Sequence, residues 1–379
     1  MAIRKRAWTA PDGTPKQAWQ VDYRDQSGKR RSKQFSRKKD AEAWFTQAGW
    51  EVSKGVHTPD SQSVTVAAAA DLWIAKVEAD DRERSTVDQY KRLSRLHVKP
   101  LIGGEKLSRL NRPAIESYRD ELLKTRSRAM AAKAMRALSS ILGDAERRGL
   151  VAQNVARNVK VTRSGRDKPK VEIPTRKELK ALIDHADDDL RPLVLTAIFT
   201  GLRASELLGL RWQDVDLKAA TLTVAQRADR YRQLGPPKSD AGYRTLPIPP
   251  ALVSELKAWK RRCPIGALDL VFPNTQGGVA EYVHVMRRRF RPLQVAAGVC
   301  DEVGQDKAGK PVLKPRYGLH SLRHAAASAW IKQRIDLKRL QTWIGHSSIQ
   351  VTLDTYGHLI ADIEGDAALI AAAEKELLS

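Results

Sequence analysis

The sequence is poor in cysteine and in long apolar segments. Its two cysteines, Cys263 and Cys300, do not form a CxxC pair, which argues against a disulfide framework and against a cysteine-based zinc site. No uninterrupted apolar run approaches the roughly 20 residues that a membrane-spanning helix needs. A GxxxxGK[ST] loop for nucleotide phosphates is also missing from the sequence. These absences exclude small disulfide-rich proteins, membrane-spanning proteins and P-loop ATPases.

Positive charge is abundant instead. The 379 residues include 67 Lys and Arg against 44 Asp and Glu, a formal net charge of +23. Lys and Arg displace condensed counterions from a phosphate backbone, so a surplus of this size indicates a nucleic-acid partner. A basic protein with no polyanionic partner is the alternative. At about 100–200 residues per domain, the length predicts two or three domains.

Residues 1–57 are predicted to form a small module of a sheet and one helix. Trp19, Val21 and Tyr23 alternate with polar residues, as in a strand with one buried face, and a turn leads into a returning strand over 29–35. The apolar residues from Ala41 to Ala48 recur at helical spacing. Cations crowd the strands and are expected to contact DNA, with a solvated face as the alternative: Arg24, Lys29, Arg30, Arg31 and Lys33.

Residues 63–156 are predicted to form an all-helical domain suited to binding. Its expected helices cover 67–77, 86–97, 113–123 and 129–148. The second of these should bury Tyr90, Leu93 and Leu96 and present Lys91 and Arg95 as DNA-binding cations. A basic linker, 157–173, follows, and its cations are also expected to contact DNA: Arg163, Arg166 and Lys168.

Residues 174–379 are predicted to form a mixed domain that carries the chemistry. A capping box, Thr175 with Glu178, marks a helix start, and strands are expected at 221–224 and 244–248. Four motifs stand out within this range. They are Arg203 in TGLRASEL, Lys238 in GPPKSDAGYRTLPI, His320 and Arg323 in HSLRH, and His346 followed by Tyr356 in IGHSSIQVTLDTYGH.

Each motif alone has an ordinary structural explanation, as a surface cation, a helix cap or a packed aromatic residue. The two histidines of HSLRH resemble a zinc-protease helix, but Ser321 stands where that motif needs glutamate. Together the residues fit metal-free phosphoryl transfer. Guanidinium groups can bind the non-bridging oxygens, a tyrosine hydroxyl can attack phosphorus, and lysine and histidine can move protons.

In order and spacing, these motifs resemble the tyrosine recombinase (phage integrase) family. PKSDAGYRTLPIP resembles the family's hairpin with its active-site lysine, LVAQNVARNV resembles the end of its core-binding domain, and the N-terminal module is similar to an arm-type DNA-binding domain. The resemblance implies a multidomain α+β fold. Its parts are an arm-type domain (1–57), a helical core-binding domain (63–156), the linker (157–173) and a mixed α/β catalytic domain with a C-terminal tail helix (174–379).

The same resemblance implies a role for each motif residue. Tyr356 would form a 3′-phosphotyrosyl link and free a 5′-hydroxyl, while Arg203 and Arg323 hold the scissile phosphate. His320 would act as general acid and base, Lys238 would protonate the leaving oxygen, and His346 would hydrogen-bond the phosphate. Glu206 is expected to orient Arg203 through an ion pair. Neither a cofactor nor a metal is implied.

At the level of the whole assembly, the resemblance implies a cytoplasmic, nucleoid-associated enzyme of a bacterial host that integrates or excises a mobile element. Four protomers would join two duplexes at core-type and arm-type attachment sites and pass through a Holliday junction. The tail after Ile360 would dock on a neighbouring protomer, and DNA-bending and excision proteins are the expected accessory partners. Two alternatives stay open: strand cleavage like that of a type IB topoisomerase, and a non-catalytic architectural DNA-binding protein.

Overall fold

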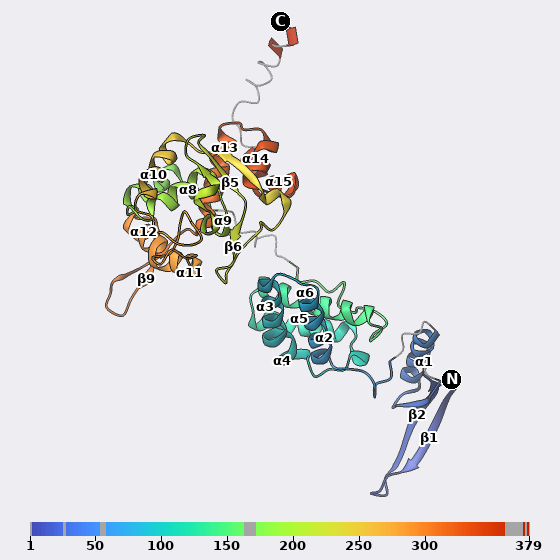
Figure 1. Cartoon of the computed structure of the whole chain (residues 1–379). Helices are drawn as coiled ribbons and strands as arrows, with labels where there is room; N and C mark the ends of the chain where they lie inside the picture. Colours follow the sequence, from blue (N-terminus) through green and yellow to red (C-terminus); the bar gives the residue numbers. More distant parts are fainter. Residues whose placement is uncertain are drawn as a thin grey trace. The chain divides into compact units, whose positions relative to one another are not determined.

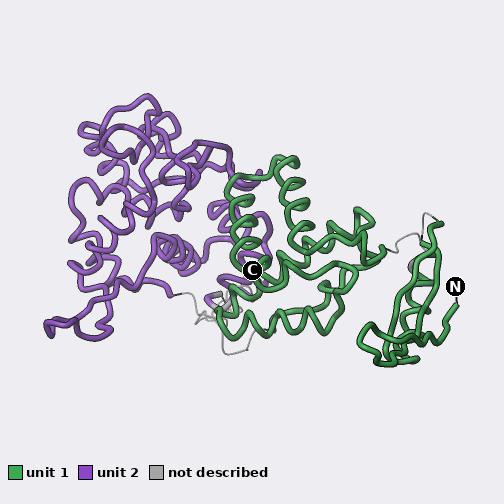
Figure 2. Tube along the Cα trace, turned by 90° about the horizontal axis from the view of Figure 1, so that it is seen from below, with its two compact units in different colours: residues 1–168 green, residues 169–379 purple. Residues whose placement is uncertain are grey.

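The computed structural model describes residues 2–25, 28–53, 58–162 and 172–360 and, near the C-terminus, 374–375 and 377–378. The chain divides into two compact units, residues 1–168 and residues 169–379 (Figure 2). The sequence predicts a finer division of the first unit at residues 57 and 63, and that division stays a prediction.

The first unit begins with a three-stranded antiparallel sheet in the order β1-β2-β3, followed by helix α1. The elements are β1 (Ala2–Thr9), β2 (Pro15–Arg24), β3 (Arg30–Phe35) and α1 (Lys38–Ser53). Val21 and Tyr23 of β2 are buried, and Tyr23 meets Trp44 of α1 edge to face at 5.1 Å between ring centroids. Strand β1 was not predicted, because nearly all of its side chains are exposed and no alternating apolar pattern marks it.

The rest of the first unit is helical, as the apolar spacing predicts (Figure 1). Its helices are α2 (Val66–Ala79), α3 (Arg84–Leu93), α4 (Lys99–Ile102), α5 (Arg112–Thr125) and α6 (Arg128–Arg147). The side chains of Thr65, Asn111 and Ser127 accept hydrogen bonds from backbone N–H groups at the starts of α2, α5 and α6.

One predicted core position in this unit is wrong. Between α3 and α4 the helix passes through a π-helical turn, Ser94–Val98. A π turn adds a residue to the helical repeat and rotates the side chains that follow it. Leu96, expected in the core, is therefore exposed, while His97 and Val98 are buried. The π turn also leaves Arg95 on the exposed surface, as the DNA-binding prediction requires.

The second unit is a mixed α/β structure. Its helices are α7 (Arg176–His185), α8 (Arg191–Thr200), α9 (Ala204–Gly209), α10 (Pro250–Lys260), α11 (Tyr282–His284), α12 (Arg291–Ala296), α13 (Leu319–Lys332), α14 (Leu337–Ile344) and α15 (Ile349–Ile360). Its strands are β4 (Val215–Asp216), β5 (Thr221–Val224), β6 (Arg227–Ala228), β7 (Leu234–Gly235), β8 (Arg244–Pro247), β9 (Cys300–Gln305) and β10 (Pro311–Pro315). The predicted capping box is present, because Thr175 and Glu178 exchange hydrogen bonds at the start of α7.

Helix α8 lies at the centre of this unit. It contacts α7, α9, α10 and α13, and residues 192–197 are all buried. The predicted strands pair as expected, in an antiparallel sheet of order β4-β5-β8. Helices α13, α14 and α15 contact one another (Figure 1). Tyr356 belongs to the small apolar cluster between them, with Ala327, Ile331, Leu340 and Ile344.

Candidate active site

The position of Arg203 follows from the point at which α8 ends. Helix α8 stops at Gly201, whose φ of 58° is left-handed. A side chain at this position would also press against Ala326 and Ile344, each 3.3 Å from an added Cβ. Two residues later, Arg203 precedes α9, and its backbone N–H donates to Oε2 of Glu206 at 2.9 Å. The arginine is therefore held at the start of a helix, with 37% of its side chain exposed.

Arg323 is a buried cation bonded to backbone carbonyls. Its residue is 1% exposed, and its guanidinium donates to Gly201 O at 2.8 Å and to Ile344 O at 2.5 Å. Burial, and then the nearby Arg203 guanidinium, lower the pKa of Arg323 to about 9. The group is still charged at neutral pH, and it ties the end of α8 to the end of α14.

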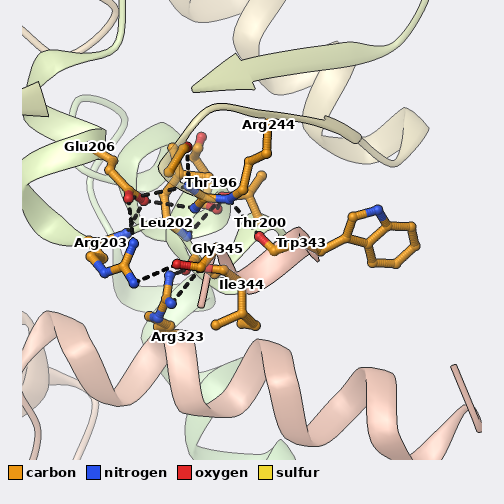
Figure 3. Close-up of polar contacts among 12 residues, drawn as sticks. Thr196, Thr200, Leu202, Arg203, Glu206, Arg244, Arg323, Trp343, Ile344 and Gly345 are labelled. Carbon is orange, nitrogen blue, oxygen red and sulfur yellow. Dashed lines mark hydrogen bonds and ion pairs between the residues drawn. The ribbon is translucent and has the colours of Figure 1, made fainter. Parts of the chain in front are cut away.

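Glu206 joins two arginines that lie far apart in the sequence (Figure 3). Its Oε1 lies 2.8 Å from Nη1 of Arg203, which confirms the predicted ion pair, and its Oε2 lies 2.8 Å from Nη2 of Arg244. The carboxyl group is buried, which by itself would raise its pKa. Hydrogen bonding and charge from Arg244, followed by the charge of Arg203, outweigh that effect and hold the pKa below the usual value.

The turn between α14 and α15 is where these groups meet. Arg203 donates to Gly345 O at 2.9 Å, Arg323 donates to Ile344 O, and Arg244 donates to Trp343 O at 2.7 Å (Figure 3). Gly345 has a φ of 70°, and an added Cβ would lie 2.9 Å from Nη1 of Arg244. Three guanidinium groups thus hold three consecutive carbonyl groups, and glycine is needed for the close approach.

Tyr356 is buried beside this turn. Only 1% of the residue is exposed, and its hydroxyl lies 2.9 Å from Nδ1 of His324. Burial raises the pKa of the phenol, while the charges of Arg323 and Arg203 oppose that rise. Both guanidinium groups therefore act electrostatically on the hydroxyl. Tyr356 thus lies within the electrostatic influence of the two predicted arginines, and its role as nucleophile stays a prediction.

His320 and His346 line the same site. The His346 Nδ1 lies 3.0 Å from Oγ1 of Thr352, and its ring lies parallel to that of Tyr356, 6.4 Å between centroids. Burial, and then the charges of Arg323 and Arg203, lower the pKa of His346 to about 4. His320 is exposed at the edge of the site. Protein atoms packed around its ring, and then the charges of Arg323 and Arg203, lower its pKa as well. Both imidazoles are neutral at pH 7 and can accept or donate hydrogen bonds.

Lys238 is exposed in the loop that connects β7 with β8. The same loop continues into a turn at Asp240–Gly242, which approaches Gly345 through the carbonyl of Ala241. The segment that carries Lys238 therefore borders the site. The role of Lys238 in the site stays a prediction.

Two residues of this site, Arg244 and His324, lie within the sequence motifs but have no catalytic role predicted from the sequence. Arg244 lies on β8, whose side chains alternate between buried and exposed, and its position is a buried one beside Leu246. A charged residue on an inward strand position signals a buried partner. His324 follows Arg323 directly on α13, and a helix places it on a neighbouring face, toward α15.

The cations predicted to bind DNA have varied surroundings in the first unit. Arg24, Lys29, Arg30, Lys91 and Arg95 are exposed, with Nζ of Lys91 at 2.5 Å from Oε1 of Glu78. Contrary to the prediction, Arg31 and Lys33 do not lie on an exposed strand face. They pair with Tyr23 and Val21 in the sheet, so their side chains lie on the same face as those two buried residues. Arg31 pairs with Asp25 at 2.8 Å, and Lys33 lies over the Trp44 ring at 5.1 Å.

Other predictions fall outside the described residues. These are the linker cations Arg163, Arg166 and Lys168 and most of the tail beyond Ile360. Among the residues that are described, no three His, Cys, Asp or Glu side chains come together as metal ligands. A search of the same residues finds no helix with the length and apolar character to span a bilayer.

Comparison of the whole sequence with known proteins gives consistent results. The chain is 27% identical to a "Tyrosine recombinase XerC-like" protein of Caldanaerobacter subterraneus, over 89% of this chain and 90% of that protein. It is 23% identical to the ICEBs1 integrase of Bacillus subtilis, over 81% of this chain and 83% of that protein. These similarities extend well beyond the second unit.

Solved structures show the same fold. The Tn1549 transposon integrase in complex with a circular intermediate DNA superposes with a TM-score of 0.66 and 19% identity, over 84% of this chain and 100% of that one. A lambda integrase tetramer bound to a Holliday junction gives a TM-score of 0.59 and 20% identity, over 90% and 95% of the two chains.

The family model described as "Phage integrase family" matches residues 173–362, half of the chain, and this range includes Arg203, Arg323 and Tyr356. The structural likeness gives this chain the multidomain α+β fold of the integrases. Together with the relatives, these findings place the protein among the site-specific DNA recombinases. The chain belongs to the phage integrase family of tyrosine recombinases.

Proposed function

We propose that this recombinase cleaves and rejoins duplex DNA through a covalent link between Tyr356 and a 3′-phosphate. The observation that supports it most is the convergence of Arg203 and Arg323 on the turn at Gly345, with Tyr356 within the electrostatic reach of both. The partly exposed Arg203 can reach a phosphate group of bound DNA. The buried Arg323 supplies positive charge in a region with little water, where it acts more strongly.

The reaction is a transesterification at one phosphorus atom. The Tyr356 oxygen bonds to phosphorus as the bond to the 5′-oxygen breaks, the phenolic proton is lost, and the 5′-oxygen gains a proton and leaves as a hydroxyl. Rejoining reverses these steps with a 5′-hydroxyl of either duplex. The phosphodiester energy is kept in the tyrosyl ester, so the exchange proceeds without ATP.

The surrounding residues take the remaining roles in this proposal. His320, a neutral imidazole at the rim, serves as general acid and base, and His346 hydrogen-bonds the phosphate. Lys238 on the bordering loop protonates the 5′-oxygen. Since Tyr356 is 1% exposed, DNA binding has to open access to its hydroxyl.

The assembly follows the relatives in this proposal. Four protomers hold two duplexes at core-type and arm-type sites and exchange strands through a Holliday junction, as the solved lambda integrase tetramer on such a junction suggests. The C-terminal tail docks on a neighbouring protomer. The protein acts at the nucleoid in the cytoplasm, where DNA-bending and excision proteins assist it in moving a mobile element.

A nicked suicide substrate tests the cleavage step. Cleavage beside the nick releases a short fragment with a 5′-hydroxyl end, and once this fragment has diffused away the covalent complex cannot be rejoined. Wild-type protein should form an adduct that survives denaturation, and Tyr356→Phe should bind the same DNA but form none. A persistent adduct in Tyr356→Phe would show that another residue is the nucleophile. Adduct formation by the wild type should also survive EDTA, and its loss on chelation would point to a metal-dependent reaction instead.

A second substrate separates recombination from strand relaxation. Two labelled duplexes that carry the attachment site should exchange strands to give a hybrid product. Relaxation of a supercoiled plasmid with no hybrid product would favour an activity like that of a type IB topoisomerase.

A further inference from the structure

His324 occupies a position between the helix of Arg323 and the helix of Tyr356. It follows Arg323 on α13, and its Nδ1 lies 2.9 Å from the Tyr356 hydroxyl on α15. Its ring meets the His320 ring edge to face at 4.7 Å and the Tyr356 ring at 5.6 Å between centroids. The imidazole is thus packed between two aromatic neighbours and has one nitrogen at the phenol oxygen.

The direction of this hydrogen bond follows from the protonation states. Burial raises the pKa of Tyr356, so its oxygen carries a proton at neutral pH. Burial, followed by the neighbouring His320 and the charge of Arg323, lowers the pKa of His324 to about 4, so its ring is neutral. A neutral imidazole offers one nitrogen as an acceptor, and a buried hydroxyl needs one. The hydroxyl therefore donates to Nδ1, with the ring proton on Nε2.

The charged and aromatic neighbours of the hydroxyl have other roles. The guanidinium groups of Arg323 and Arg203 carry donors alone. The His346 ring lies nearly parallel to the phenol ring, at an interplanar angle of 12°, and its Nδ1 is engaged with Thr352. The hydrogen bond to Nδ1 of His324, at 2.9 Å, therefore sets the direction of the O–H bond. With that proton directed away, the oxygen lone pairs are left for attack.

We propose that His324 is a positioning residue, whose Nδ1 accepts the hydrogen bond of the Tyr356 hydroxyl and holds the phenol oxygen for attack on the scissile phosphate. This inference rests on the proposed function, since it takes Tyr356 as the nucleophile. It adds a residue outside the six predicted to act on the phosphate. It also explains why a half-buried histidine stands beside Arg323, where its charged form is disfavoured.

Two substitutions separate the hydrogen bond from the volume of the ring. His324→Asn keeps an acceptor near the place of Nδ1, whereas His324→Leu fills the space with no polar atom. We expect His324→Leu to slow adduct formation by about tenfold at saturating protein, the order expected when a bond that orients a reacting atom is lost. His324→Asn should recover most of that loss, and DNA affinity should stay the same in both variants. His185→Asn is the matched control, because His185 is exposed in the same unit.

The outcomes distinguish this inference from the proposed function. If Tyr356→Phe still forms the adduct, the nucleophile is misassigned and the function fails. If Tyr356→Phe abolishes the adduct while His324→Leu reacts as fast as the wild type or faster, the function stands and the positioning role is overturned. Equal losses in His324→Leu and His324→Asn would also overturn it.

A spectroscopic measurement on the full-length protein keeps the test valid even if His324→Leu folds poorly. A long-range 1H–15N spectrum of histidine side chains reports which ring nitrogen carries hydrogen. We expect a bare Nδ1 on His324, assigned through its disappearance in His324→Asn, and a shift of that signal in Tyr356→Phe with His185 unchanged. A protonated Nδ1, or a signal that Tyr356→Phe does not move, would contradict the proposal.

Discussion

The two units differ in where their arginines lie, because the described arginines that are buried, Arg244 and Arg323, both belong to the second unit. In the second unit, Glu206, Arg244 and Arg323 are buried, and each is held by carbonyl groups or by an opposite charge. In the first unit, cations such as Arg30 and Arg95 are exposed to solvent. Buried, fixed charges stabilise a transition state because they need no rearrangement during the reaction. Exposed charges add affinity that depends on salt. We therefore expect the buried charges of the second unit to serve the chemistry and the exposed cations of the first unit to add DNA affinity.

The largest expected effect comes from breaking the buried ion pair. Arg244→Met leaves the Glu206 carboxylate with Arg203 as its remaining partner and releases the carbonyl of Trp343. We expect the free energy of unfolding to fall by about 3 kcal/mol, as for other buried pairs that lose one member. Urea denaturation measures it. Arg112→Met removes an exposed pair with Glu116 and should change the free energy of unfolding little. Equal losses of stability in the two variants would contradict the contrast between buried and exposed charges.

The next effect concerns the rate of the reaction. Arg323→Lys keeps the charge but loses the forked pair of bonds to Gly201 and Ile344. We expect adduct formation to slow by about 10²–10³-fold, the usual result of removing one fixed donor, with DNA affinity nearly unchanged. Single-turnover cleavage of the suicide substrate measures the rate. A parallel loss of affinity would show that Arg323 serves binding rather than the transition state.

Acid should destabilise the second unit through its histidines. The pKa values of His324 and His346 are lowered to about 4 in the folded protein, from about 6.5. Between these values the unfolded chain binds more protons than the folded one, so stability is full above about pH 6.5 and falls as the pH decreases toward 4. Urea denaturation at several pH values should show this decline. His346→Gln should flatten this decline, whereas His185→Gln should not. An unchanged slope in His346→Gln would contradict a half-buried, neutral His346 imidazole.

The smallest effects should come from single exposed cations of the first unit. Arg95→Ala should weaken DNA binding modestly and reduce the slope of log K against log salt by about 0.9 if one phosphate contact is lost. Lys91→Ala should do less, because Lys91 is already paired with Glu78. Salt titration of DNA affinity compares the two. A slope unchanged in both variants would place the DNA contacts elsewhere.

Local features of the fold were predictable because their causes lie close together in the sequence. The capping box at Thr175 and Glu178 needs residues three apart, and the pairing of β5 with β8 follows from alternating apolar residues. Strand β1 escaped prediction because its side chains are largely exposed. The exposure of Leu96 escaped it because a π turn changes the helical repeat without a clear mark in the sequence.

The sequence predicts most of the residues that make up the site, but fewer of the contacts between them. The pairing of Arg203 with Glu206 is local, one helical turn apart. The pairing of Glu206 with Arg244 joins positions 38 residues apart, and that of Tyr356 with His324 joins different helices. Tertiary packing brings these groups together, α9 with β8 in the first pair and α13 with α15 in the second. Sequence spacing alone could therefore not assign a role to Arg244 or His324.

The most direct test of the account is to identify the atom that becomes attached to DNA. The wild-type protein is trapped on a nicked substrate, digested with protease and nuclease, and its peptides are sequenced by tandem mass spectrometry. The account predicts a nucleotide joined through its 3′-phosphate to Tyr356, in the peptide of α15. A nucleotide on any other residue, or cleavage with no covalent peptide, would contradict it.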